Sequence, residues 1–322
     1  MKTIDFNQPV GLALGSGAAR GLAHIGVLKY LEENSIDVGW IAGSSIGALV
    51  GAAYAVGISS HEMIQIIEHL DWKFMVKHFS PTFATRGMVS GHSLTSFFHS
   101  LLGDAKIEDL KIPFRAVATD IHTGERVVIS KGSLVDAVRA SISIPVIFQP
   151  IRIAQRTLVD GGLVDPVPVE VVKQMGATSV VAVSVSQTQG KPKVKSGNRQ
   201  GQALSNAKGK TSQKMPAGML YERMSRFLRV SGTTDSDAPN SPSSPSGEPL
   251  PNMLQIFWQT VTIAEQEITR LRLQVCPPDF VIQPDTNSMQ SWEFIHALEA
   301  VKAGELAAKI TFKDVVPNQR RK

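Results

Sequence analysis

The chain has 322 residues, a hydrophobic content of 43% and a formal net charge of +5 at pH 7. This length suits one large α/β domain with additions, because a domain takes about 150 residues. The single cysteine, Cys276, excludes an internal disulfide framework and favours a reducing, cytoplasmic environment. Residues 1–7 lack the apolar core of a signal peptide, so we expect no export signal.

The first predicted unit is a buried strand, a small-residue loop and a helix. Residues 10–14 are apolar throughout, as in a parallel strand, and apolar residues repeat at helical spacing over 20–33. The loop at 15–21 is rich in glycine, but Arg20 stands where a dinucleotide-binding fingerprint requires glycine. Free N–H groups in such a loop bind anions, which leaves a nucleotide phosphate or the oxyanion of an acyl intermediate as the ligand.

The next unit contains a Gly-x-Ser-x-Gly pentapeptide, which follows an apolar strand and precedes an alanine-rich helix at 46–56. That order predicts a nucleophile elbow, a sharp turn that presents the hydroxyl of Ser45 above a sheet. Gly43 and Gly47 flank the serine where a side chain would collide with the neighbouring helix or strand. The helix also directs its positive end at the serine.

Residues 40–60 offer a membrane alternative, because they contain no Asp, Glu, Lys or Arg and would just cross a bilayer core. Their glycines and serines and the turn inside the run favour a buried helix instead, since a central helix is also apolar on all sides. We therefore expect no transmembrane insertion here.

Helices and a strand pair are predicted before residue 150. The helices are expected at 59–70, 91–102 and 134–141, and the strands at 114–120 and 126–130.

An apolar strand at 157–159 then enters Asp160-Gly161-Gly162. This order places a carboxylate at a sheet edge with room for a substrate to approach. A plain Asp-Gly turn is the alternative. A helix at 166–175 and an apolar strand at 179–185 follow.

Residues 187–252 differ from the rest in composition, being rich in Gly, Ser, Lys, Gln and Pro, which is typical of a disordered insert. They contain ten basic and four acidic residues, a net charge of +6, so the remainder carries −1. Within them, 219–229 predicts a basic amphipathic segment suited to an anionic membrane surface. Two interpretations of this insert stay open: a merely solvated charge run, or peripheral contact with the inner face of an anionic membrane. Because the basic charge lies outside the fold, we expect no nucleic-acid partner.

Residues 253–322 predict a long helix at 254–273, a short strand at 279–283 and a terminal helix at 292–310. We expect them to pack back on the catalytic core, 1–186, because neither piece could close a core alone.

Three constellations together form the parts of an acyl-transfer site: the N–H donors of the glycine loop, the hydroxyl of Ser45 and the carboxylate of Asp160. A triad in the α/β-hydrolase order would need a histidine after the acid, and His296 is the one that follows. It lies in the terminal helix pattern, where neighbours such as Ile295 suggest packing. A Ser45–Asp160 dyad therefore fits better.

At these motifs the chain resembles bacterial members of the patatin-like phospholipase family, the group that includes neuropathy-target-esterase-like proteins. The family's oxyanion loop, nucleophile motif and Asp-Gly-Ala/Gly motif occur in order, at 12–21, 43–47 and 160–162. By this resemblance Ser45 is the nucleophile and Asp160 the base, and Gly17 and Ala18 provide the oxyanion donors. The supporting residues of the three motifs are Gly15, Ser16, Arg20, Gly21, Gly43, Gly47, Gly161 and Gly162.

The resemblance implies a three-layer α/β/α fold with a mainly parallel sheet, and hydrolysis of lipid or lysophospholipid acyl esters without a metal or cofactor. Arg20 would either steady the oxyanion loop or meet a phosphate, and a merely solvated residue at the helix N-terminus is the alternative. A regulatory or adaptor protein that uses the same fold without catalysis is the alternative.

One departure from the family's pattern concerns Ser16 and Ala18, which stand where members often carry glycine. A side chain leaves the backbone N–H group free to donate where φ is negative. We therefore expect an intact oxyanion hole with a tighter or altered acyl entrance.

Overall fold

The computed structural model describes residues 8–69, 91–186, 253–289 and 294–313. These residues belong to one compact unit, which comprises 1–190 and 252–322. The predicted insert at 187–252, with its basic segment at 219–229, lies outside the described residues. None of the helices in the described ranges has both the length and the apolar character that crossing a bilayer requires.

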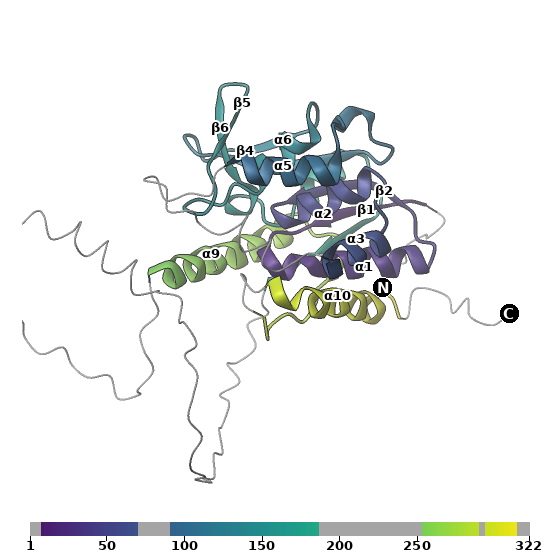
Figure 1. The fold of residues 1–322 in the computed structure, drawn as a ribbon. Helices are drawn as coiled ribbons and strands as arrows, with labels where there is room; N and C mark the ends of the chain where they lie inside the picture. The colour runs from purple at the N-terminus through teal and green to yellow at the C-terminus, as the bar shows by residue number, and fades with distance from the viewer. Residues whose placement is uncertain (1–7, 70–90, 187–252, 290–293, 314–322) are drawn as a thin grey trace, which may run out of the picture. The chain divides into compact units, whose positions relative to one another are not determined.

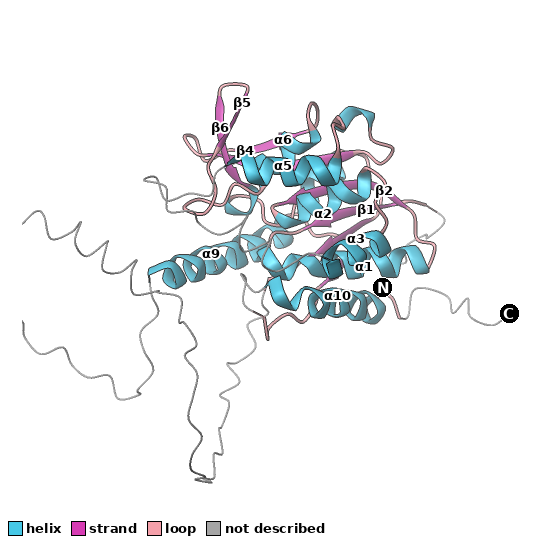
Figure 2. Ribbon diagram, viewed as in Figure 1, coloured by secondary structure: helices cyan, strands magenta, loops and turns pink. Residues whose placement is uncertain are grey.

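A mixed, mostly parallel sheet forms the centre of the unit (Figures 1 and 2). The strand order is β5-β6-β3-β2-β1-β7-β8, and β4 pairs with β3. Pairings among β1, β2, β3, β7 and β8 are parallel, whereas β4, β5 and β6 pair antiparallel. The strands are β1 Val10–Leu14, β2 Val38–Ser44, β3 Phe114–Asp120, β4 Arg126–Ile129, β5 Ile151–Ile153, β6 Arg156–Asp160, β7 Val180–Val183 and β8 Phe280–Ile282.

Helices cover both faces of the sheet. The α-helices are α1 Ala23–Glu33, α2 Ile46–Ala55, α3 Ser60–His69, α5 Gly91–Leu102, α6 Leu134–Ser141, α7 Val169–Gln174, α9 Met253–Val275 and α10 Ala297–Thr311. Short 3₁₀ turns are η1 Ala18–Leu22, η2 Ile107–Asp109, η3 Gly161–Leu163 and η4 Phe294–His296.

Alternate residues of β1 show the layering directly. Leu12 and Leu14 pack in the core that contains residues of α1, α2, α6 and α10. Ala13 faces the other side, where it packs in a second core with residues of α7. A central parallel strand is buried on both faces, which explains why its sequence is apolar without alternation. The predicted three-layer α/β/α fold with a mainly parallel sheet is confirmed.

The C-terminal segment packs against the first helix, as Figure 1 shows for α10 beside α1. A Cβ atom added at Gly26 of α1 would overlap the carbonyl oxygen of Val301, and one added at Gly304 of α10 would overlap that of Ala23. The two glycines therefore allow the helix backbones to touch. β8 extends the sheet beside β7, so this segment completes both a helix layer and the sheet edge.

Several element boundaries differ from the prediction. The predicted helix at 20–33 begins as the 3₁₀ turn η1 and becomes α-helical only at Ala23, because the loop enters it with Ala18 at φ +49°. α7 begins at Val169 rather than at 166, since a residue that precedes a proline, here Pro168, is kept out of the helical region. The short edge strand β5 was not predicted.

Candidate active site

Ser45 sits on a sharp turn between β2 and α2, at φ 54° and ψ −125°. This conformation is costly for a residue with a side chain and is characteristic of functional sites. The flanking glycines allow the turn: a Cβ atom at Gly43 would overlap the carbonyl oxygen of Gly47, and one at Gly47 would overlap that of Leu14. The local structure is therefore a strand-to-helix elbow with the serine at its apex.

The backbone of the elbow is fixed by a residue that the sequence did not point to. The N–H of Ser45 donates to Oγ of Ser141 over 2.9 Å. That hydroxyl in turn donates to the carbonyl oxygen of Val117 on β3 over 2.6 Å. Since Ser141 is fully buried at the end of α6, it links the elbow to the neighbouring strand.

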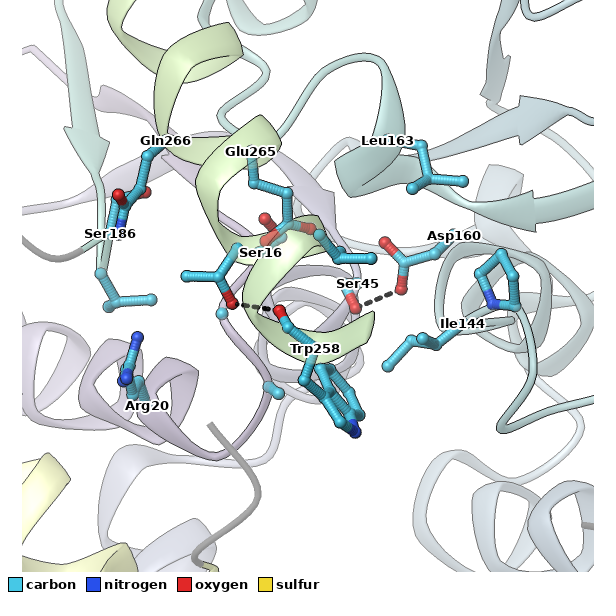
Figure 3. Close-up of a pocket in the computed structure, with 16 residues that line it drawn as sticks. Ser16, Arg20, Ser45, Ile144, Asp160, Leu163, Ser186, Trp258, Glu265 and Gln266 are labelled. Carbon is cyan, nitrogen blue, oxygen red and sulfur yellow. Dashed lines mark hydrogen bonds between the residues drawn. The ribbon is translucent and has the colours of Figure 1, made fainter. Parts of the chain in front are cut away.

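Asp160 ends β6, which pairs antiparallel with β3 so that Asp160 lies opposite Ala118. The hydroxyl of Thr119 donates to the backbone carbonyl of Asp160 over 2.7 Å. The side chain then accepts two hydrogen bonds. The N–H of Gly162 donates to Oδ1 over 2.7 Å, and the hydroxyl of Ser45 donates to Oδ2 over 2.5 Å (Figure 3).

The Asp160 carboxyl group is buried, and its electrostatics follow from that. Burial raises the pKa of Asp160 to about 6, although the hydrogen bonds from Ser45 and Gly162 favour the charged form. The group is therefore ionised at neutral pH and still a better proton acceptor than an exposed aspartate.

The glycine loop that precedes η1 approaches the elbow. Gly17 has φ 154° and Ala18 has φ +49°. The condition of negative φ is therefore not met at Ala18, where the loop places a small side chain in the left-handed region. Among the described residues, neither the N–H of Gly17 nor that of Ala18 has a hydrogen-bond acceptor in the protein. Both residues line the same pocket as Ser45.

Two buried side chains hold this loop in place. Nε2 of His24 lies 2.7 Å from the carbonyl oxygen of Gly15, and burial lowers the pKa of His24 to about 4, so the neutral ring donates this bond. Arg20 is also buried, and its Nε donates to the carbonyl oxygen of Met289 over 2.9 Å. These contacts favour the role of steadying the loop, and the alternative of a merely solvated Arg20 is wrong because the side chain is buried. His24 was not singled out in the sequence, because no local pattern distinguishes it from other helix residues.

Packing also explains the remaining motif glycines. A Cβ atom at Gly21 would overlap the side chain of Ile46, and one at Gly161 would overlap the carbonyl oxygen of Val117. At Gly15 an added Cβ would lie 2.8 Å from the carbonyl oxygen of Val183. The loop, the elbow and the Asp-Gly-Gly turn are thus held in contact by residues that lack side chains.

The pocket around Ser45 and Asp160 is narrow, with a cavity of about 30 Å³. One of its walls is α9, which contributes Trp258, Val261, Thr262 and Glu265, as Figure 3 shows for the labelled Trp258 and Glu265. The apolar side chains of Ile144 and Leu163 line other parts of it. Local sequence patterns gave no sign that α9 would form part of the site.

His296 is not among the residues that line this pocket. It lies on η4, where Nδ1 is 3.1 Å from Oε1 of Glu299. The packing suggested for its neighbour Ile295 is wrong, because that side chain is 66% exposed. In the described residues, no three His, Cys, Asp or Glu side chains are arranged to hold a metal ion.

A sequence model described as patatin-like phospholipase matches residues 12–173, which include the glycine loop, the elbow and Asp160. An uncharacterized NTE family protein of Mycobacterium tuberculosis (strain ATCC 25618 / H37Rv) is 32% identical over 93% of this chain and 90% of its own length. The chain belongs to the patatin-like phospholipase family.

Other family members match over part of their length. Patatin-like phospholipase domain-containing protein 6 of Homo sapiens is 36% identical over 55% of this chain and 13% of its own. Lysophospholipase NTE1 of Candida glabrata is 32% identical over 59% of this chain and 11% of its own. The solved structure of VipD from Legionella pneumophila is similar to this chain with a TM-score of 0.46 at 15% identity. The match covers 95% of this chain and 67% of the VipD chain.

Proposed function

We infer that this patatin-like protein is a serine hydrolase of lipid acyl esters that works through a Ser45–Asp160 dyad. The observation that carries the proposal is the 2.5 Å hydrogen bond from the serine hydroxyl to Oδ2 of the buried aspartate. A nucleophile whose proton already points at an ionised base, on a strained elbow beside free N–H groups, has the arrangement needed for acyl transfer.

In the first half-reaction, Oγ of Ser45 attacks the ester carbonyl carbon and its proton passes to Oδ2 of Asp160. The N–H groups of Gly17 and Ala18 stabilise the negative charge on the carbonyl oxygen, an effect worth about 3 kcal/mol for each well-placed donor. When the tetrahedral intermediate collapses, the alcohol leaves with the proton from Asp160, and the acyl group remains on the serine.

In the second half-reaction, Asp160 accepts a proton from a water molecule, which attacks the acyl carbonyl. Collapse of the second intermediate releases the fatty acid, and the proton on Asp160 returns to Oγ of Ser45. The Gly162 N–H stays on Oδ1 throughout, so Oδ2 remains oriented toward the serine.

The lipid substrate class is supported by the family and by the lining of the pocket. Ile144, Leu163, Trp258 and Val261 provide apolar surface beside the dyad, suited to an acyl chain. The relative from Candida glabrata is named a lysophospholipase. We therefore expect a monoacyl phospholipid to be a substrate, with hydrolysis at its ester bond.

The proposal is tested with Ser45→Ala and Asp160→Asn, assayed on 4-nitrophenyl butyrate and on a lysophospholipid. Each variant should lose at least about a thousandfold in kcat/KM, because the nucleophile or its base is missing. Circular dichroism should show an unchanged fold. Turnover retained in either folded variant would contradict the dyad.

A fluorophosphonate probe separates an enzyme from a non-catalytic adaptor with the same fold. We expect the wild type to be labelled and Ser45→Ala not to be labelled. Ser44→Ala is the matched control, because Ser44 is adjacent and fully buried and its hydroxyl has no partner among the described residues. The control should be labelled like the wild type. An unlabelled wild type would favour the adaptor.

A further inference from the structure

A second carboxyl group lies in the pocket of the proposed dyad. Glu265 is half-buried on α9, and its carboxyl group lies in the pocket with Asp160 and Ser16 (Figure 3). A Cβ atom added at Gly162 would overlap Oε1 of Glu265 and would lie 3.0 Å from Oδ1 of Asp160. The glutamate carboxyl group thus occupies space that an alanine at 162 would fill.

The helix that carries Glu265 is anchored beside the dyad. Trp258, Glu265 and Arg272 recur at intervals of seven, so they lie on one face of α9. Nε of Arg272 donates to the carbonyl oxygen of Val164 over 2.7 Å, just after η3. Because α9 packs on η3, which follows Asp160 directly, the helix is fixed at the turn that carries the aspartate.

The titratable groups that face this carboxyl group come from two other elements: Asp160 at the end of β6 and Arg20 on η1. Burial and then the charge of Asp160 raise the pKa of Glu265 to about 8, whereas a hydrogen bond with Ser16 and the charge of Arg20 act in the opposite direction. With the pKa of Asp160 at about 6, the two carboxyl groups carry a single negative charge between roughly pH 6 and pH 8.

We propose that Glu265 is a positioning residue of the dyad, whose uncharged carboxyl group beside Asp160 is required for activity and whose ionisation ends the active pH range. This inference rests on the function proposed above. Transferring the serine proton to Asp160 leaves the new negative charge on the substrate oxygen. An ionised Glu265 in the same buried pocket would oppose that charge, whereas the neutral acid does not.

The test is the pH dependence of kcat/KM on 4-nitrophenyl butyrate from pH 5 to 10, corrected for uncatalysed hydrolysis. For the wild type, the plot of kcat/KM against pH should be bell-shaped, with half-maximal values near pH 6 and pH 8. Glu265→Gln keeps the size and the neutral polar group, so it should retain the acid limb and lose the alkaline one. When each activity at pH 9.5 is divided by the same protein's activity at pH 7, the ratio for Glu265→Gln should exceed that for the wild type by on the order of thirtyfold.

Glu267→Gln is the matched control, because Glu267 lies on the same helix but is exposed and pairs with Arg270. Glu267→Gln should show the same bell-shaped dependence of kcat/KM on pH as the wild type. If kcat/KM of Glu265→Gln falls at alkaline pH with the same midpoint as that of the wild type, the proposal is overturned. If the wild type has no esterase activity at any pH, the proposed function fails instead.

Infrared spectroscopy tests the charge of Glu265 without catalysis or a folded variant. Wild-type protein labelled with ¹³C-glutamate should show a protonated glutamate carbonyl band at pH 7 that disappears by pH 9.5. If no such band is present at pH 7, Glu265 is already ionised there and the proposal is overturned.

Discussion

At the scale of single residues, the site depends on side chains that fix the backbone around the dyad. Ser141 is the clearest case, because its hydroxyl accepts from the N–H of Ser45 and donates to Val117 on β3. Both of these backbone groups are buried, so each needs a hydrogen-bond partner. His24 plays a comparable part at the carbonyl oxygen of Gly15.

Replacing Ser141 by alanine should therefore harm both stability and rate. The N–H of Ser45 and the carbonyl of Val117 would lose their partner inside the protein, at about 1–3 kcal/mol of unfolding free energy. The freed elbow should lower kcat more than it changes KM, since Ser45 would no longer be held against Asp160. Urea unfolding and steady-state kinetics measure the two effects.

Ser100→Ala serves as the comparison for this variant, because Ser100 is exposed and its hydroxyl bonds within its own helix. It should change the unfolding free energy by less than about 0.5 kcal/mol. A Ser141→Ala protein with wild-type stability and kcat would contradict the role of Ser141 in fixing the backbone at Ser45.

At the scale of elements, α9 forms one wall of the pocket and meets the Asp-Gly-Gly turn where Glu265 lies against Gly162. An alanine at 162 would overlap Oε1 of Glu265, so either the helix or the side chain must move. The absence of a methyl group at residue 162 therefore allows α9 and Glu265 to lie where they do.

A double-mutant cycle on this contact measures that link. Gly162→Ala alone should destabilise the protein by about 1–3 kcal/mol, as overpacking does. In the background of Glu265→Ala the same change should cost less by at least about 1 kcal/mol, because the obstructing carboxyl group is gone. Urea unfolding of the four proteins gives the coupling energy. If the changes in unfolding free energy of the two single variants simply add in the double variant, residues 162 and 265 do not interact and the predicted contact is wrong.

The sequence predicted the elements that have a local pattern. The apolar run of β1, the glycine-flanked elbow and the Asp-Gly-Gly turn are each encoded within a few neighbouring residues, so their secondary structure could be predicted. Glu265 could not be singled out, because its spacing fits an ordinary amphipathic helix and only tertiary packing brings it to Asp160. The catalytic roles of Ser45 and Asp160 remain predictions.

At the scale of the whole molecule, residues on both sides of 187–252 build one unit. β8 pairs with β7, and α10 meets α1 through Gly26 and Gly304. Phe312 stacks on Tyr30 with ring centroids 5.9 Å apart. The core of the N-terminal part is therefore closed by the C-terminal part.

Residues 1–186 expressed alone should consequently fail to form a stable domain. Without β8 and α10, the edge of β7 and the face of α1 would be exposed, and the lost burial includes Ile282 and Phe312, both fully buried in the complete chain. We expect no cooperative thermal transition and strong binding of a hydrophobic dye, with the full chain as the control. A cooperative transition close to that of the full chain would contradict this view of the core.

The position of α9 in the chain has a consequence for biosynthesis. A ribosome completes Ser45 and Asp160 long before it reaches α9, the helix that lines their pocket. The burial that raises the pKa of Asp160 is therefore complete only after α9 has been synthesised and has packed on the pocket. The Ser45 hydroxyl is thus synthesised before the helix that completes its surroundings.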